Sequence, residues 1–91
     1  MKLLGTPLCI MCDKAVEKLE ANGITYEYFD ITKNIENLKK FIHFRDIRKE
    51  FDLAKETEHV GIPCFMFEDG SLLFDLDGAI HRALVEEKEL C

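Results

Sequence analysis

Two cysteines, Cys9 and Cys12, stand between a short apolar segment and an amphipathic one, and this placement constrains the fold more than any other feature. Residues 2–4 predict a strand, and Pro7 predicts a loop after it because proline cannot donate to a strand ladder. Residues 9–21 carry apolar side chains at helical spacing, which predicts a helix that begins at the pair. Free N–H groups at a helix N-terminus stabilise a thiolate, the species that attacks disulfides. The position of the pair therefore predicts thiol–disulfide exchange.

The middle of the chain predicts one strand and a long helical region. Residues 25–31 are rich in β-forming side chains and predict a second strand. A strand, a helix and a strand within about thirty residues are typical of a βαβ unit with parallel strands. Apolar spacing over residues 35–42 predicts a second helix, and residues 44–54 predict that the helical region continues after a break and ends before Val60.

The last third of the chain predicts a hairpin and a final helix. Residues 64–67 predict a buried strand and residues 72–74 its return strand, with Asp69-Gly70 between them as the signal of a two-residue hairpin loop. We expect Asp77 to cap the last helix. The expected buried face of that helix consists of Leu76, Ile80, Ala83 and Leu84.

The size and content of the chain predict one domain over residues 1–91. A chain of 91 residues, 47% of them hydrophobic, can bury a single core. The order of its elements, βαβαββα, places it in the α/β class. No signal peptide and no apolar stretch of membrane-spanning length stand out, so we expect the protein in the cytoplasm and without a membrane partner. We also expect it to be a monomer.

This order, with a Cys-x-x-Cys pair opening the first helix and Ile62-Pro63 before the third strand, resembles the glutaredoxins of the thioredoxin-fold superfamily. The resemblance implies a thioredoxin-like fold: a four-stranded mixed sheet flanked by helices, here with a longer helical segment before the third strand. It also implies a thiol–disulfide oxidoreductase that reduces protein or glutathione mixed disulfides. Its partners would be such disulfides and a disulfide reductase. No bound cofactor is implied, and glutathione would be a reductant.

The same resemblance suggests what each site residue does. Cys9, the first and more exposed thiol, attacks the disulfide, and Cys12, one turn further along, resolves the mixed disulfide. Pro63 is expected in the cis form, and Ile62 is expected to bind the backbone of an extended substrate. Asp77 takes the place of the aspartate that binds the amino group of glutathione.

The chain departs from the glutaredoxin pattern at several positions. Glutaredoxins usually carry a basic residue three positions before the first cysteine, where this chain has Thr6. They also have a Gly-Gly pair before the last helix, which is missing from residues 74–78. Ile10-Met11 inside the motif is more apolar than the dipeptides usual in glutaredoxins or thioredoxins. These departures keep open a second hypothesis, a binding module that carries a metal or an iron–sulfur cluster, or docks a partner through residues 34–59, without turnover.

Other residues permit more than one interpretation. Cys64 is either a third reactive thiol or metal ligand near the pair, or a small apolar residue of a core strand, which is the simpler interpretation. The three histidines lack metal-binding spacing. The net charge of -6 argues against a nucleic-acid partner. The basic residues between positions 39 and 49 are interpreted as a solvated helix face, with the neighbouring phenylalanines turned to the core.

Overall fold

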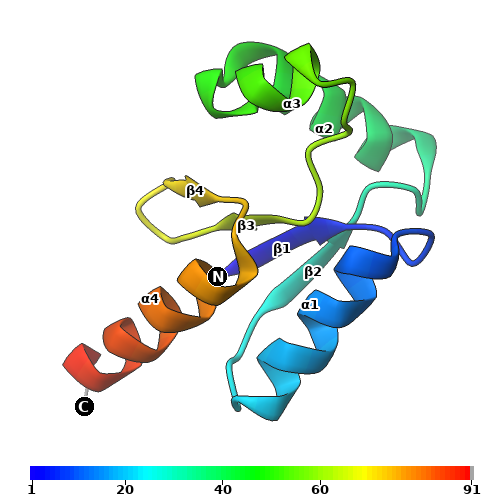
Figure 1. Cartoon of the computed structure of the whole chain (residues 1–91). Helices are drawn as coiled ribbons and strands as arrows, with labels where there is room; N and C mark the ends of the chain where they lie inside the picture. The colour runs from blue at the N-terminus through cyan, green and yellow to red at the C-terminus, as the bar shows by residue number, and fades with distance from the viewer. Residues whose placement is uncertain (91) are drawn as a thin grey trace.

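A four-stranded mixed sheet forms the centre of the protein. The computed structural model describes the main chain of residues 1–90 and the side chains of residues 1–86. The strands are β1 (Lys2–Gly5), β2 (Glu27–Asp30), β3 (Cys64–Met66) and β4 (Leu72–Leu73), in the order β2-β1-β3-β4. β1 is parallel to β2 and antiparallel to β3, and β3 is antiparallel to β4 (Figure 1). This arrangement confirms the predicted thioredoxin-like α/β fold.

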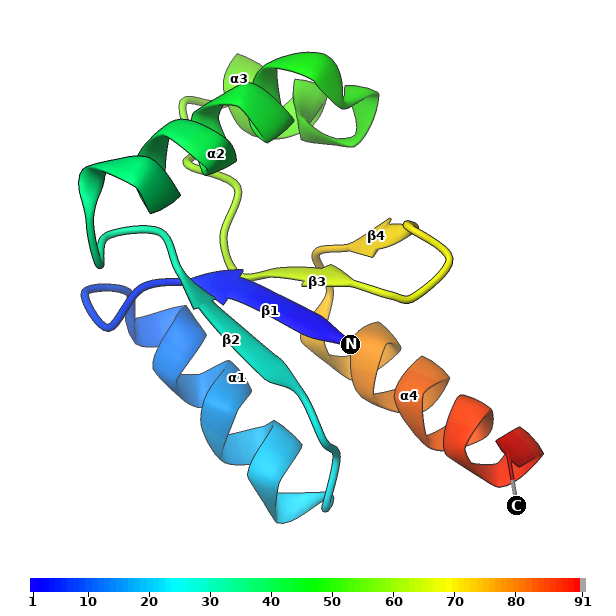
Figure 2. The ribbon, with the colours of Figure 1, turned by 180° about the vertical axis from the view of Figure 1, so that it is seen from behind.

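Helices cover both faces of the sheet, as the two opposite views show (Figures 1 and 2). α1 (Ile10–Ala21) and α4 (Leu76–Leu90) lie on one face. α2 (Ile35–Ile47), the 3-10 turn η1 (Lys49–Phe51) and the short α3 (Asp52–Glu56) lie on the other. Among the helices of residues 1–90, none combines the length and the apolar character that crossing a bilayer requires.

The alternation of side chains along the strands divides the core into two parts. Leu3 and Phe65 point to the face covered by α1 and α4, where they join the buried side chains of those helices. Leu4 and Cys64 point to the opposite face and pack with residues of α2 and η1. Successive residues of one strand therefore belong to different cores, and Cys64 belongs to the core that lies away from α1.

Phe51 is the centre of the second core. Its side chain is fully buried and packs edge to face against Phe41, Phe44 and Phe74, with ring centroids 5.8, 5.7 and 5.1 Å away. Gly61 lies so close that a Cβ at this position would be 2.7 Å from Phe51 Cδ1. The phenylalanines of the basic segment are thus turned to the core, as the sequence predicted.

The boundaries of three elements differ from the predicted ones. The second strand covers only Glu27–Asp30 instead of residues 25–31. The predicted break in the helical region is present, but it comes later than residues 42–44, because α2 continues to Ile47. The break comes at Arg48, which has an extended backbone and donates to Glu50 and to the Gly70 carbonyl. The hairpin loop contains three residues, 68–70, instead of the two that were predicted. Phe67 N–H donates a hydrogen bond to the Ser71 carbonyl across the loop, and Gly70 N–H donates to the Phe67 carbonyl.

The capping residue of the last helix is Asp75, and the prediction of Asp77 was wrong. Asp75 Oδ2 accepts a hydrogen bond from Gly78 N–H at 2.9 Å, the geometry of an N-cap. Asp77 lies in the first turn, where its negative charge suits the helix dipole. The buried face of α4 also differs from the predicted one. Ala83 is buried as predicted, together with Ala79, whereas Leu76, Ile80 and Leu84 are only partly buried.

We expect Phe51→Ala to lower the free energy of unfolding by about 3–5 kcal/mol, because it opens a cavity between three aromatic rings. Urea denaturation followed by circular dichroism measures this loss. Ile47→Ala is the matched control, since Ile47 is exposed on α2 and its truncation should change stability by less than about 0.5 kcal/mol. A similar small loss for both variants would show that Phe51 does not organise this core.

Candidate active site

Cys9 is the N-cap residue of α1. Its backbone is extended, and its Sγ accepts a hydrogen bond from the Cys12 backbone N–H at 3.3 Å. The Cys9 carbonyl accepts from the N–H groups of Cys12 and Asp13 at 3.1 Å each, which starts the helix. The sulfur thus takes the place of the capping oxygen of a serine or aspartate. A backbone donor and the positive end of the helix dipole both favour a negatively charged sulfur there.

Cys12 is fully buried under the first turn of the helix. Its side chain lies over Gly5 at the end of β1, so close that a Cβ at Gly5 would be 2.9 Å from Cys12 Sγ. Burial raises the pKa of Cys12 to about 12, and the hydrogen bond and negative charge of Cys9 act in the same direction. The backbone of Thr6 acts in the opposite direction and lowers the pKa. The pair therefore combines a partly exposed thiol with a buried, protonated one.

A hydroxyl pair fixes the loop that carries Cys9. Thr6 is buried, and its Oγ1 lies 2.7 Å from Thr32 Oγ1 while it accepts a hydrogen bond from Leu8 N–H at 3.2 Å. The Thr6 carbonyl accepts from Cys9 N–H at 3.1 Å and closes the turn. In the sequence, Thr6 was noted only because glutaredoxins usually have a basic residue there. Its role in holding the loop before Cys9 was missed.

Tyr28 is a second residue near the pair that the sequence did not single out. Its hydroxyl would lie 3.4 Å from a Cβ at Gly5, on the side of the strand where Cys12 packs. Burial raises the pKa of Tyr28 to about 12, and the nearby Cys12 and Asp30 act in the same direction. Residues 25–31 were interpreted only as strand-forming, since the parallel pairing of β1 and β2 is needed to bring Tyr28 beside the site.

The Ile62–Pro63 peptide bond is cis, which confirms the prediction for Pro63. The pairing of Leu4 with Cys64 places Pro63 opposite Gly5, where the chain leaves β1 toward Cys9. Ile62 is half-buried, and its N–H and C=O make no hydrogen bond to another group within residues 1–90. The cysteine pair and the cis-proline therefore belong to the same end of the sheet.

A pocket of about 280 Å³ opens beside Pro63. We call it the cis-proline pocket. Its apolar lining residues are Leu53, Ala54, Gly61, Ile62, Pro63 and Phe74. Its polar lining residues are Glu50, Thr57 and His59, and all three have partners: Glu50 pairs with Arg48 at 2.6 Å, and His59 Nδ1 lies 2.8 Å from Thr57 Oγ1.

Cys64 does not join the pair. Although it follows Pro63, its side chain is fully buried in the core of α2 and η1, on the other face of the sheet from Cys12. Burial raises the pKa of Cys64 to about 12, and the nearby Arg48 opposes this shift. The interpretation of Cys64 as a core residue agrees with this position. Cys91 lies outside the described residues.

Asp77 is exposed and its Oδ1 lies 3.4 Å from Lys18 Nζ on α1. Its carboxylate therefore has a cationic partner within the chain. Cys9, Cys12 and Cys64 are all free thiols. Among the side chains of residues 1–86, no three histidine, cysteine or acidic groups lie close enough together to hold a metal ion, and the pair alone offers two sulfur ligands.

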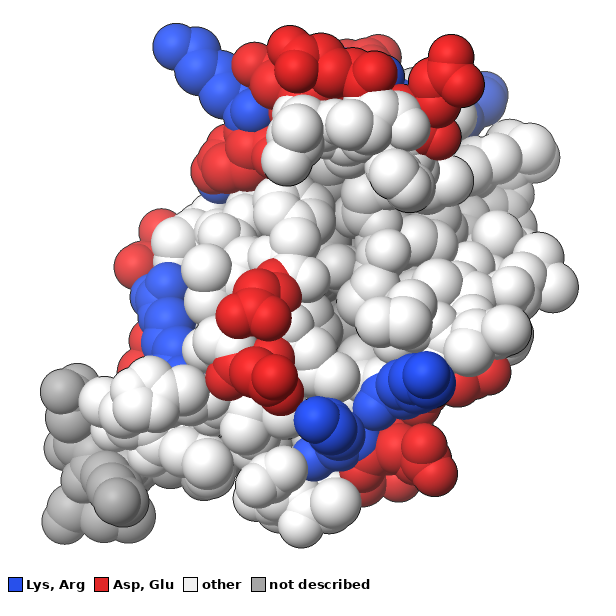
Figure 3. Space-filling view, in the orientation of Figure 1, with Lys and Arg blue, Asp and Glu red and all other residues white. Residues whose placement is uncertain are grey.

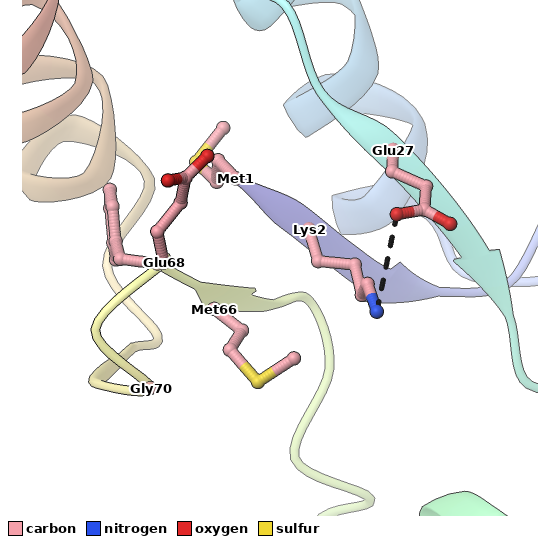
Figure 4. Close-up of a pocket in the computed structure, with 7 residues that line it drawn as sticks. Met1, Lys2, Glu27, Met66, Glu68 and Gly70 are labelled. Carbon is pink, nitrogen blue, oxygen red and sulfur yellow. Dashed lines mark ion pairs between the residues drawn. The ribbon is translucent and has the colours of Figure 1, made fainter.

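A second pocket, of about 350 Å³, lies at the start of β1, the opposite end of that strand from the cysteine pair (Figure 4). Two of its lining residues, Lys2 and Glu27, form an ion pair at 4.0 Å. The residues described in its lining include no cysteine and no histidine. It therefore offers no group for the chemistry that the cysteine pair suggests.

Comparison with known proteins agrees with this geometry. The family model described as Glutaredoxin matches residues 1–50, which contain β1, the cysteine pair and α1 through α2. An uncharacterised protein of Haemophilus influenzae is 36% identical over 61 residues, which cover 67% of this chain and 71% of that protein. No solved structure matches the chain.

We expect Gly5→Ala to lower the free energy of unfolding by about 1–3 kcal/mol, since the added methyl group must displace the buried Cys12 sulfur. Urea denaturation of the reduced protein measures this loss. Lys2→Ala, at the partly exposed start of the same strand, is the control and should change stability by less than about 0.5 kcal/mol. If both variants are equally stable, Cys12 does not pack tightly against Gly5.

Stability should fall at alkaline pH because of the buried thiols. A thiol with a raised pKa keeps its proton in the folded protein while the unfolded chain releases it, so unfolding becomes easier as the pH rises above the ordinary value of 9.0. Between about pH 8 and pH 10, the wild type should lose about 1 kcal/mol more than Cys64→Val, which removes one such thiol. Urea denaturation at the two pH values measures the difference. Equal losses would show that Cys64 ionises normally in the folded state.

Proposed function

Because this chain belongs to the glutaredoxin family, we propose that it is a thiol–disulfide oxidoreductase in which Cys9 attacks and Cys12 resolves. The observation that carries the proposal is the asymmetry of the pair. Cys9 caps α1 with a backbone donor at its sulfur, whereas Cys12 is buried and protonated one turn further along. An attacking thiol needs access to the substrate and a stabilised negative charge. A resolving thiol needs to stay protonated until the mixed disulfide has formed.

The reaction proceeds in two exchanges. The Cys9 thiolate attacks one sulfur of a substrate disulfide, so that a Cys9–substrate bond forms while the original S–S bond breaks, and the released thiolate takes a proton from solvent. Cys12 then gives up its proton and attacks Cys9 Sγ, which releases the second substrate thiol and leaves a Cys9–Cys12 disulfide. The substrate gains two electrons and the pair loses two.

The order of these steps follows from the coupling between the two sulfurs. Burial is the main reason that the pKa of Cys12 is raised, and the hydrogen bond and negative charge of Cys9 add to it. Once Cys9 is part of a mixed disulfide, it carries no negative charge. The contribution of Cys9 is then removed, and Cys12 loses its proton more easily at the moment when it is needed.

Other residues hold the substrate. We assign the substrate backbone to Ile62 and Pro63, since Pro63 lies opposite Gly5 and the polar groups of Ile62 have no partner within residues 1–90. Asp77 is the proposed contact for a substrate amino group, in exchange with Lys18. Glutathione or a disulfide reductase would reopen the oxidised pair, and this cycle suits the reducing cytoplasm.

Single serine substitutions separate the two roles. With bis(2-hydroxyethyl) disulfide as the oxidant, Cys12→Ser should accumulate a mercaptoethanol adduct on Cys9, because no thiol resolves it, and Cys9→Ser should form none there. Mass spectrometry of acid-quenched protein measures both. Cys64→Ala, on the other face of the sheet, should keep the wild-type rate within about twofold. Adducts on Cys12 in the Cys9→Ser protein at the wild-type rate would refute the assignment.

A further inference from the structure

Resting on the proposed function, we propose that the preferred substrate is a disulfide in an extended polypeptide whose cysteine is flanked by apolar side chains, rather than a glutathione mixed disulfide. The inference comes from the chemistry of the side chains that surround Cys9 and Pro63. A substrate has to fit these surfaces as well as reach the sulfur.

The residues next to Cys9 are apolar and exposed. Leu8 is 84% exposed and Ile10 is 73% exposed, and Met11 is also largely exposed. These three side chains are not needed for the core, since α1 packs through its opposite face. Exposed apolar side chains grouped together mark interaction sites. A disulfide that approaches Cys9 therefore meets Leu8, Ile10 and Met11.

The cis-proline pocket, which Ile62 and Pro63 line, is a second apolar surface at this end of the sheet. Leu53 is 70% exposed at the edge of the pocket, and Phe74 lines it and packs edge to face with Phe51. In the space-filling view, the surface between α3 and the loop before α1 is uncharged (Figure 3). The pocket thus provides apolar surface directly at Ile62 and Pro63, the segment that we assign to the substrate backbone.

The charges around the site do not suit glutathione, which carries two carboxylates. No lysine or arginine is among the described residues that line the cis-proline pocket, and its one carboxylate, Glu50, is already paired with Arg48. Thr6, where a basic residue would stand, is buried and bonded to Thr32. With a net charge of -6, the chain as a whole repels an anionic tripeptide. Charge therefore favours a neutral, apolar occupant.

An extended polypeptide satisfies the remaining polar groups. A segment that pairs with the free N–H and C=O of Ile62 projects alternate side chains to opposite sides. In the proposed complex, one of these side chains enters the cis-proline pocket and another contacts Leu8 or Ile10. A cysteine in the middle of such a segment reaches Cys9 while its neighbours cover apolar surface on both sides.

The test compares three disulfides that share mercaptoethanol as the second thiol. One is a peptide with leucine and valine around its cysteine, the second is a peptide of equal length with serine and glutamine there, and the third is glutathione. The rate constants for their reduction by the pre-reduced protein are measured by rapid quench and mass spectrometry. Burial of a single apolar side chain predicts an advantage of about tenfold for the apolar peptide over each of the others. A glutathione disulfide that reacts as fast as the apolar peptide overturns the inference.

A variant pair locates the preference. Leu53→Ser should reduce the ratio of apolar to polar peptide rates toward one, and Ile47→Ser, similarly exposed but outside the pocket, should leave that ratio unchanged. An unchanged ratio in Leu53→Ser refutes the role of the pocket. Bis(2-hydroxyethyl) disulfide, which has no flanking groups, separates the two proposals. If the wild type does not reduce it, the proposed function fails, whereas its reduction without any peptide preference refutes only the substrate class.

Discussion

Cys12 can be buried at the start of α1 because the residue beneath it, Gly5, has no side chain. This contact brings the first turn of the helix down onto the end of β1. The helix therefore begins at Cys9 and leaves the Cys9 sulfur at its N-terminus, partly exposed to solvent. A larger residue at position 5 would lift the turn and separate the attacking thiol from its backbone donor. Packing of Cys12 against Gly5 thus sets where the Cys9 sulfur lies relative to the helix N-terminus.

The same strand organises the second half of the site. Because β1 alternates its side chains between the two faces, Leu4 points to the core of α2 and η1, next to Cys64 and Phe51. The pairing of Leu4 with Cys64 sets the register that places Pro63 opposite Gly5. The ring of Phe51 packs against Gly61 and Phe74, which line the pocket beside Pro63. The surface that we propose for substrate binding is therefore held by the core that lies away from α1, so both cores support the same end of the sheet.

The sequence was sufficient for the parts of this arrangement that depend on local pattern. The order of elements, the helix start at Cys9 and the cis form of Pro63 were predicted correctly, the last through a resemblance of motifs. The parts that depend on register were not predictable. Whether Cys64 faces the pair or the opposite core is decided by the parity of its pairing with β1, and a shift of one residue would reverse the answer. The cap of α4 was missed because Asp75 and Asp77 are equally suitable as residue types, and only the path of the chain decides between them.

If the chain is the oxidoreductase that we propose, the contacts around the site bear on how such an acidic protein would select its partners. Ionic recognition would require cations beside Cys9, and these would act on every anionic thiol in the cell at long range. Apolar contacts act only at short range, and they stabilise a complex in which apolar side chains on both sides of the disulfide are removed from water. Backbone pairing with Ile62 adds direction, since it aligns the segment without reading its side chains. Together, these interactions favour disulfides in exposed apolar segments, the kind of segment that is accessible when a protein is partly unfolded.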